Sequence, residues 1–141
     1  MDQGRVAVTH MFDLHDFERI AQAVPYGIYT IPEVSMVGLT EEKAREQKLD
    51  YGVARARYVD VPRGVMMGDE MGLLKIIYHR ASRVVLGVHI IGTKATEMIH
   101  YGMELIEAGR DLRHIIGAVF NYPTLHELYK RAAYEAWEKR E

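Results

Sequence analysis

The chain has no cysteine among its 141 residues. Disulfide bonds and dithiol redox chemistry are therefore excluded within it, and a reducing cytoplasmic location is the default expectation. No apolar run is long enough to span a bilayer, and the polar start MDQGRVAVTH lacks the apolar core of a signal peptide. The net charge is only -2, so the sequence gives no indication of a nucleic-acid partner.

The composition is that of one folded domain. Hydrophobic residues make up 48% of the chain and charged residues 27%, which is ordinary for a soluble globular protein with a real core. Residues 1–27 carry the weakest pattern: a short helix followed by a charged connector that stops at Pro25. The pattern becomes clear only from residue 28 onward.

Three stretches predict β-structure. Residues 28–39 are rich in β-branched and aromatic side chains, and Pro32 indicates an edge or a bend. Residues 53–61 alternate, which predicts a strand with Arg55 and Arg57 on its wet face. Residues 73–79 and 83–92 flank a short polar turn and predict a β-hairpin.

Helices are predicted between and after these strands. Thr40 is a good N-cap for a first helix, Glu41 suits an i,i+4 pair with Arg45, and Gly52 ends that unit. Residues 93–109 and 124–140 carry amphipathic stripes, and 111–119 form a shorter helix. Because strands come first and helices last, the fold class predicted is α+β, an antiparallel sheet with helices packed on one side.

Two weak motifs favour structural interpretations. The turn between Gly87 and Gly92 resembles a phosphate-binding loop, but Lys94 is displaced by one residue from the position that phosphate binding requires. A strand-to-helix turn with Thr93 or Thr96 as cap is favoured. The seven histidines show no HxxxH spacing and have no cysteine beside them, so no metal site is predicted.

The stretch VFNYPTLHELYKR, residues 119–131, holds a phenol, an imidazole and a carboxylate close together. Thr124 and Glu127 fit a capping box, in which Glu127 reaches back to a free backbone N–H group. The spacing favours this structural interpretation over a catalytic one. Tyr122 alone is a poor general base, because an ordinary phenol has a pKa of about 10.

Three segments carry a family resemblance: YTIPEVSMVGLTEEKA, GVHIIGTKATEMIHYGMELI and NYPTLHELYKRAA. Together they resemble the C-terminal interface, or dimerisation, domain of the flavoprotein disulfide reductases, over roughly residues 28–140. The resemblance implies the dimerisation-domain fold for residues 28–141. It also implies that residues 1–27 are a remnant of the last FAD-domain helix plus a connector.

The resemblance also implies site residues. In the disulfide reductases the matching stretch carries a His-Pro-Thr base and a later Glu that orients it. Here Tyr122 stands at the His position and Glu127 at the Glu position, which makes them the catalytic-position candidates, with the base lost. Tyr122 and Pro123 would lie near the flavin of the partner subunit in the full-length enzyme. At His126 the family usually has a small residue.

The FNYPT form resembles the soluble pyridine nucleotide transhydrogenase branch, which passes hydride between NADPH and NAD through flavin and needs no thiol base. The expected function is therefore that of a dimerisation-domain fragment of such an enzyme, a cytoplasmic homodimer with FAD in the full-length protein. The Gly-rich FAD and NAD(P) fingerprints are absent, so the chain alone is expected to be inactive and to bind no FAD. The alternatives are the interface domain of a lipoamide-dehydrogenase-like reductase and a stand-alone dimerisation module.

Overall fold

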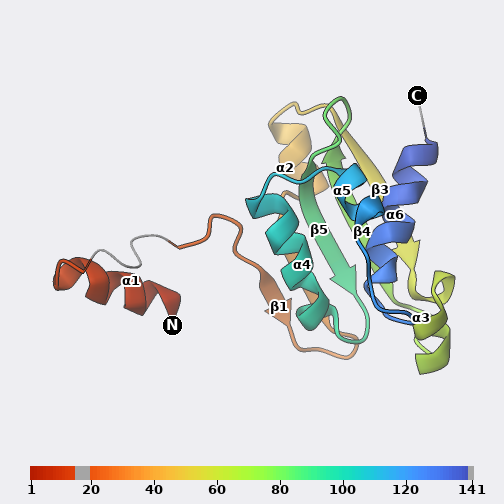
Figure 1. Cartoon of the computed structure of the whole chain (residues 1–141), viewed down its shortest axis with the longest axis horizontal. Coiled ribbons are helices and arrows are strands. Elements are labelled where there is room, and N and C mark those ends of the chain that lie inside the picture. Colours follow the sequence, from red (N-terminus) through yellow and green to blue (C-terminus); the bar gives the residue numbers. More distant parts are fainter. Residues whose placement is uncertain (15–19, 140–141) are drawn as a thin grey trace.

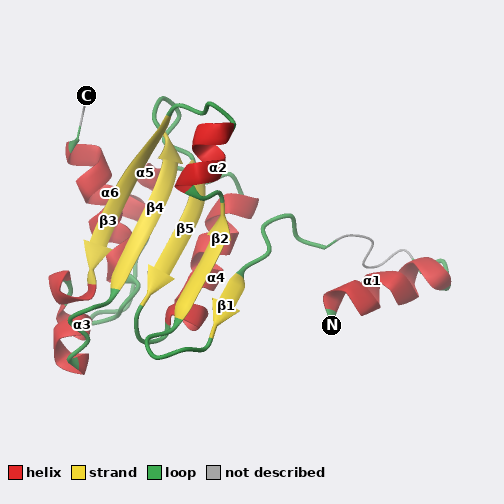
Figure 2. Cartoon of the chain, turned by 180° about the vertical axis from the view of Figure 1, so that it is seen from behind, coloured by secondary structure: helices red, strands yellow, loops and turns green. Residues whose placement is uncertain are grey.

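One antiparallel sheet organises the molecule. The computed structural model describes residues 1–14 and 20–139, and within these ranges a five-stranded sheet has the order β1-β2-β5-β4-β3 (Figure 2). The strands are β1 Tyr26–Ile28, β2 Val34–Gly38, β3 Tyr51–Arg57, β4 Leu73–His79 and β5 Val85–Ile91. All neighbouring pairs are antiparallel, and the predicted hairpin is the β4–β5 pair at the centre of the sheet.

Helices cover mainly one face of this sheet. Their bounds are α1 Asp2–Met11, α2 Glu41–Glu46, α3 Pro62–Met67, α4 Ala95–Glu107, α5 Leu112–Gly117 and α6 Glu127–Glu138, with a 3-10 turn at Tyr58–Asp60. Figure 1 shows α4, α5 and α6 in front of the strands, and Figure 2 shows the same helices behind them. The predicted α+β class with helices packed on one side is confirmed.

The core lies between this helical layer and the sheet. The predicted apolar stripes of α4 and α6 face inward, and Leu128, Tyr129 and Ala132 are fully buried. The Tyr129 hydroxyl donates a hydrogen bond to the Met98 carbonyl, 2.9 Å away, which ties α6 to α4. Gly102 permits close approach of α4 to β5, because a Cβ there would lie 3.0 Å from the Val88 side chain.

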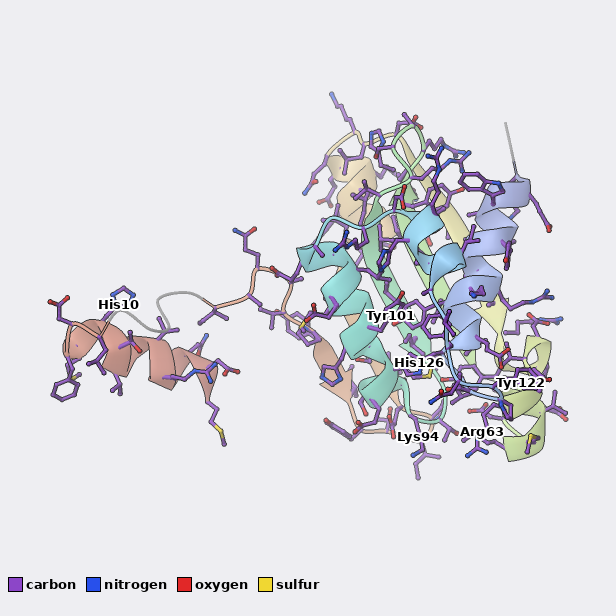
Figure 3. All side chains as sticks on the ribbon, viewed as in Figure 1. His10, Arg63, Lys94, Tyr101, Tyr122 and His126 are labelled. Carbon is purple, nitrogen blue, oxygen red and sulfur yellow. The ribbon has the colours of Figure 1, made fainter. Side chains whose placement is uncertain are left out.

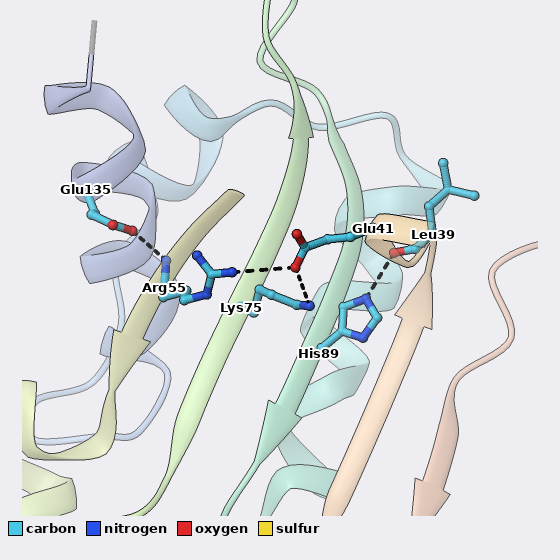
Figure 4. Close-up of polar contacts among 6 residues, drawn as sticks. All are labelled: Leu39, Glu41, Arg55, Lys75, His89 and Glu135. Atoms are coloured by element: carbon cyan, nitrogen blue, oxygen red, sulfur yellow. Dashed lines mark hydrogen bonds and ion pairs between the residues drawn. The ribbon is translucent and has the colours of Figure 1, made fainter. Parts of the chain in front are cut away.

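The other face of the sheet is largely open, and the short helix α2 covers one end of it (Figure 2). The Glu41 carboxylate pairs with Lys75 on β4 at 2.8 Å and with Arg55 on β3 at 3.5 Å (Figure 4). The predicted pair with Arg45 is therefore wrong, since α2 lies against the sheet and two strand cations reach the carboxylate. The Thr40 cap is confirmed by the Lys43 N–H group, which donates to the Thr40 hydroxyl.

A half-buried histidine lies beside this ion-pair network. His89 on β5 is within hydrogen-bond distance of the Leu39 carbonyl, with Nε2 3.0 Å from the oxygen (Figure 4). Burial lowers the pKa of His89, because removal from water disfavours the charged imidazolium. His79, the other hairpin histidine, pairs across the sheet with Tyr51, whereas His89 pairs with Lys75. The two imidazoles therefore lie at separate positions in the hairpin and do not face each other across the strands.

The bend that Pro32 indicates is present between β1 and β2, whereas two other predicted boundaries differ from the structure. The strand predicted over 53–61 ends at Arg57, where the Asp60 carboxylate accepts the Arg57 N–H bond and closes a 3-10 turn. Gly52 does not end the first helical unit; it lies inside β3, opposite Tyr78.

The two edge strands of the sheet, β3 and β1, differ in how far they are covered by other parts of the chain. On β3 the Arg55 N–H donates to the Glu135 carboxylate of α6 (Figure 4), and the Arg57 N–H donates to Asp60. These contacts satisfy backbone donors that an edge strand would otherwise expose. On β1 all three residues are exposed, and Tyr26 and Ile28 keep 60% and 55% of their surface accessible.

Helix α1 lies apart from the sheet in Figure 1. This helix is the short one predicted near the N-terminus, and most of its side chains are exposed. The connector predicted after it includes residues 15–19, which lie outside the described residues. Among the helices that the structure describes, none is long and apolar enough to cross a membrane.

Candidate functional site

The loop between α5 and α6 carries the sequence-predicted site residues. It leaves α5 after Gly117, and Tyr122 and Pro123 lie exposed at its turn. The Lys130 ammonium of α6 donates a 2.6 Å hydrogen bond to the Ala118 carbonyl and lies 5.8 Å from the centre of the Phe120 ring. These contacts attach the start of the loop to α6 and leave its turn free.

Glu127 performs the capping role that its spacing predicts. Its carboxylate accepts a 3.2 Å hydrogen bond from the Thr124 N–H group, three residues earlier. The reciprocal arm of a capping box is not formed, because the Glu127 N–H donates to the Thr124 carbonyl, 3.4 Å away, and α6 begins after His126 without a side-chain cap. The predicted capping box is therefore half formed: the Glu127 carboxylate accepts the Thr124 N–H bond, but the side-chain bond in the other direction is missing.

Tyr122 is 74% exposed. Figure 3 shows its side chain at the periphery of the domain, whereas His126 lies farther in, toward Tyr101. In the described part of the chain, no hydrogen bond joins Tyr122 to Glu127. The two residues share one loop, but Glu127 is engaged with the backbone of its own turn and Tyr122 faces outward.

His126 lies in an aromatic cluster that the sequence did not predict. Its ring is stacked at 6.2 Å on Tyr129 and is 6.3 Å from Tyr101 and 6.0 Å from Phe120, measured between ring centres. Burial lowers the pKa of His126, so the neutral imidazole is favoured. The cluster accommodates the His126 ring, and the Glu127 cap is kept.

A second member of this cluster is also unusual. The Tyr101 hydroxyl is enclosed and has no hydrogen-bond partner among the described residues. Burial raises the pKa of Tyr101, so it remains a neutral phenol. The cluster is therefore uncharged, and it supports the loop from beneath by ring packing.

A cavity of about 440 Å³ opens beside the loop. It is lined by loop residues, by α3 and by the start of α4: Arg63, Met67, Lys94, Glu97, Met98, Asn121, Pro123, Thr124, Leu125 and His126. Sequence reasoning missed Arg63 and the role of Lys94 at this place. No spacing signal could have found them, because α3, α4 and the loop meet only in the folded chain.

The turn before α4 explains why the apparent phosphate-binding motif is not one. The Glu33 carboxylate accepts the Thr96 N–H at 3.0 Å and the Thr96 hydroxyl at 2.7 Å. The Asp69 carboxylate accepts the Thr93 N–H at 2.7 Å. The prediction of Thr93 or Thr96 as side-chain cap is wrong: two carboxylates from distant segments already occupy the amides where phosphate would bind.

These hydrogen bonds affect the carboxylates themselves. Those from the Thr96 hydroxyl and N–H lower the pKa of Glu33 below the ordinary glutamate value. Burial raises the pKa of Asp69, but hydrogen bonds from Thr93 and Gly72 outweigh it, so the net pKa is lowered. Across the described ranges, no three histidine, aspartate or glutamate side chains are grouped so as to hold a metal ion.

A model of the pyridine nucleotide-disulphide oxidoreductase dimerisation domain matches residues 24–133. The chain is 43% identical over 139 residues to a soluble pyridine nucleotide transhydrogenase of Mycobacterium bovis, covering 99% of this chain and 30% of the relative. It is 38% identical over 135 residues to a protein of the same name from Erwinia tasmaniensis, covering 94% and 29%. The chain thus spans about 30% of the length of these curated relatives.

Solved structures agree on the fold. The HOCl-induced flavoprotein disulfide reductase RclA from Escherichia coli matches with a TM-score of 0.84 and 27% identity, over 94% of this chain and 31% of that one. LpdA from Mycobacterium tuberculosis matches with a TM-score of 0.83 and 21% identity, over 94% and 29%. At 21% identity the second likeness shows the fold alone.

Proposed function

The chain belongs to the family of pyridine nucleotide-disulphide oxidoreductase dimerisation domains, and we propose that it is this domain of an FAD-dependent soluble NAD(P) transhydrogenase. The observation that carries the proposal is the 43% identity, over 99% of the chain, to proteins named soluble pyridine nucleotide transhydrogenase. In the full-length enzyme, hydride would pass from NADPH to flavin and on to NAD. Residues 1–27 would be the end of the FAD domain and a connector.

The loop geometry supports an enzyme that needs no thiol base. A His-Glu pair would need an imidazole held by the carboxylate, whereas here the carboxylate of Glu127 binds the Thr124 N–H group. Tyr122 extends from the loop and is 74% exposed, so it is available to a second copy. We infer that Tyr122 and Pro123 pack near the partner's flavin in the homodimer, and that the ancestral base position no longer transfers protons.

The cofactor, the partner and the location follow from the same proposal. FAD and NAD(P) would be bound by other domains of the full-length protein, and this domain would pair two subunits. The absence of cysteine and the names of the relatives support a cytoplasmic protein. The lipoamide-dehydrogenase-like alternative is less well supported, since the curated relatives described above are transhydrogenases by name.

The test of function uses the full-length flavoprotein that contains this segment. Stopped-flow reduction by NADPH should be within about tenfold of wild type in Tyr122→Phe, a barrier change of about 1.4 kcal/mol. The reason is chemical: hydride passes between nicotinamide C4 and flavin N5, and no phenolic proton need move. A loss of about a thousandfold with flavin still bound would show that the phenol is a catalytic acid.

The test of assembly uses the chain itself. Sedimentation equilibrium at micromolar concentration should give twice the chain mass of 16.2 kDa, and the purified protein should be colourless. A clean monomer with its apolar surface buried within one chain would contradict the dimerisation role. A stoichiometric flavin absorbance band would contradict the assignment of FAD binding to other domains.

A further inference from the structure

The connector before β1 is attached to the domain at one point. Among its described residues 20–25, Ala23 alone is buried, with 7% of its surface accessible, and its side chain belongs to the apolar core. Ile20 and Val24, on either side of it, are 40% and 49% exposed. Figure 1 shows the connector reaching β1 beside the end of α4. The core therefore takes up a single side chain of this stretch, and its neighbours face solvent.

Glu107, the last residue of α4, binds the connector at this point. The Ala23 N–H group donates a hydrogen bond to the Glu107 carboxylate, 84 residues away along the chain. Within residues 20–25 the structure contains no other hydrogen bond. A buried N–H group without an acceptor is costly, so the carboxylate satisfies a donor that the burial of Ala23 would otherwise leave unpaired.

A carboxylate at this position is unfavourable for helix α4 itself. The C-terminal end of a helix carries the negative end of its dipole, where basic side chains are favoured. The last turn of α4 has no basic residue and carries Glu104 and Glu107 instead. Glu104 is exposed, and its side chain has no partner among the described residues. Glu107 differs from it by the contact with Ala23, and this contact, not the helix, explains the carboxylate there.

A cavity of about 250 Å³ lies between the connector and the domain around this contact. Gln22 and Ala23 form its wall on the connector side, and Leu39, Leu86 and Ile106 line it on the domain side. The connector is therefore not packed tightly along its length. Because alanine is small and the contact is a single hydrogen bond, this attachment can open while the sheet and its helices keep their packing.

We propose that Ala23 and Glu107 form a clasp that fixes the direction in which the connector leaves the domain, with Glu107 as the positioning residue. When the clasp is closed, the connector lies against the end of α4; when it is open, the connector pivots at the start of β1, Tyr26. In the full-length enzyme the clasp would set the orientation of the FAD domain relative to this domain, a consequence that rests on the function proposed above. The clasp itself can be measured on this chain alone.

The first measurement is amide hydrogen exchange of Ala23, followed by NMR. Glu107→Ala removes the acceptor and should speed exchange of the Ala23 N–H group by about tenfold. Glu107→Gln keeps an oxygen acceptor and should retain most of the protection, and Glu104→Ala, in the same turn of α4, is the matched control and should retain all of it. An Ala23 N–H group that exchanges without protection in the wild type, or at an unchanged rate in Glu107→Ala, would overturn the proposal.

The second measurement tests the buried side chain. Ala23→Asp places a charge in the core beside Glu107, whereas Ala21→Asp makes the same change at an exposed connector residue. The heteronuclear NOE values of the Gln22 and Val24 amides should fall in Ala23→Asp and keep their wild-type values in Ala21→Asp. Equal values in the two variants would show that no specific point attaches the connector, and the proposal would be wrong.

Two controls separate this test from other causes. The Leu39 N–H group, which donates to the Leu86 carbonyl beside the same cavity, should exchange at the wild-type rate in every variant, because the clasp opens without unfolding the sheet. All measurements use the chain without FAD or nucleotide, so their outcome is independent of whether the full-length protein is a transhydrogenase.

Discussion

Helices α4 and α6 both begin where a carboxylate accepts a backbone N–H bond, but the carboxylates come from very different distances along the chain. At α6 the acceptor is Glu127, three residues from the Thr124 donor. At α4 the acceptor is Glu33, 63 residues from Thr96, and Asp69 accepts the Thr93 N–H bond from 24 residues away. The first arrangement is local, and the second exists only when β2, α3 and α4 have come together.

The difference shows how the two turns relate to function. The turn before α4 is held at three sites, the Thr93 N–H, the Thr96 N–H and the Thr96 hydroxyl, which makes it a rigid junction between sheet and helix. The loop before α6 has one local cap, and Tyr122 at its turn is exposed. We therefore expect substitutions at the α4 turn to affect stability more than those in the loop before α6.

The largest effect is expected at Asp69. Asp69→Ala removes the acceptors of both the Thr93 N–H and the Gly72 N–H bonds, and should lower the free energy of unfolding by about 2 kcal/mol. Asp69→Asn keeps one oxygen acceptor and should cost roughly half as much. Urea denaturation monitored by circular dichroism measures both, and a cost below that of Glu127→Ala would reverse the comparison.

A smaller, pH-dependent effect is expected at Glu33. Glu33→Gln should cost about 1 kcal/mol at pH 7, because the charged hydrogen bonds to Thr96 are lost. The folded pKa of Glu33 is lowered, so its contribution is complete above the ordinary glutamate pKa of about 4.3 and is lost as pH falls through the lower folded value.

Thermal melting from pH 7 to pH 2 tests this expectation. The wild type and Glu33→Gln should differ in Tm at pH 7, and the difference should diminish at the acid end. Glu97→Gln, on the same turn of α4 and exposed, is the control and should be within about 0.5 kcal/mol of wild type at all pH values. A Tm difference that stays constant down to pH 2 would show that the charge of Glu33 contributes nothing.

The local cap should contribute less than Asp69. Glu127→Ala should cost about 1 kcal/mol, because the Thr124 N–H group loses its acceptor. Glu127→Gln should be milder, since glutamine also serves in a capping box. Chemical denaturation of the two variants side by side measures the difference; a Glu127→Gln cost as large as that of Glu127→Ala would mean that the charge, and not the hydrogen bond, matters.

The smallest effect is expected at Tyr122. Because this side chain is 74% exposed, Tyr122→Phe should change the free energy of unfolding of this chain by less than about 0.5 kcal/mol. Any larger loss, measured under conditions where the chain is monomeric, would show that the phenol holds the loop. Substitutions in the loop before α6 would then affect stability as much as some of those at the α4 turn, against the expected order.

Periodic and local features of the fold could be predicted from the sequence. The stripes of α4 and α6, the β4–β5 hairpin and the Thr40 cap depend on residues close along the chain, and the structure confirms them. The predicted end of one strand was wrong, for a reason that is partly local and partly tertiary, since the Tyr58 hydroxyl donates to the Thr93 carbonyl from 35 residues away. The strand predicted over 53–61 stops at Arg57 because Asp60 folds back on it and Tyr58 is drawn into the core.

The contacts of the candidate site also fall into those that spacing predicts and those that only tertiary packing creates. The Thr124–Glu127 contact was predicted from its spacing, whereas the aromatic cluster around His126 was not, because Tyr101 comes from α4 and only packing brings it to the loop. Glu41 is a further case: its spacing favoured Arg45, but the docking of α2 offered Lys75 and Arg55 instead. A carboxylate with several cations within reach is paired by tertiary geometry.

By itself, the sequence determined the class of the fold, the inward faces of the two long helices and the local cap of Glu127. These features depend on residue periodicity and on contacts within about one turn, which the chain specifies wherever it folds. Only the tertiary structure decided that Glu33 and Asp69 hold the turn before α4, and that Arg63, Lys94 and His126 line one cavity. The physical reason is that these contacts join segments far apart in the sequence, and they form only when the sheet and helices pack.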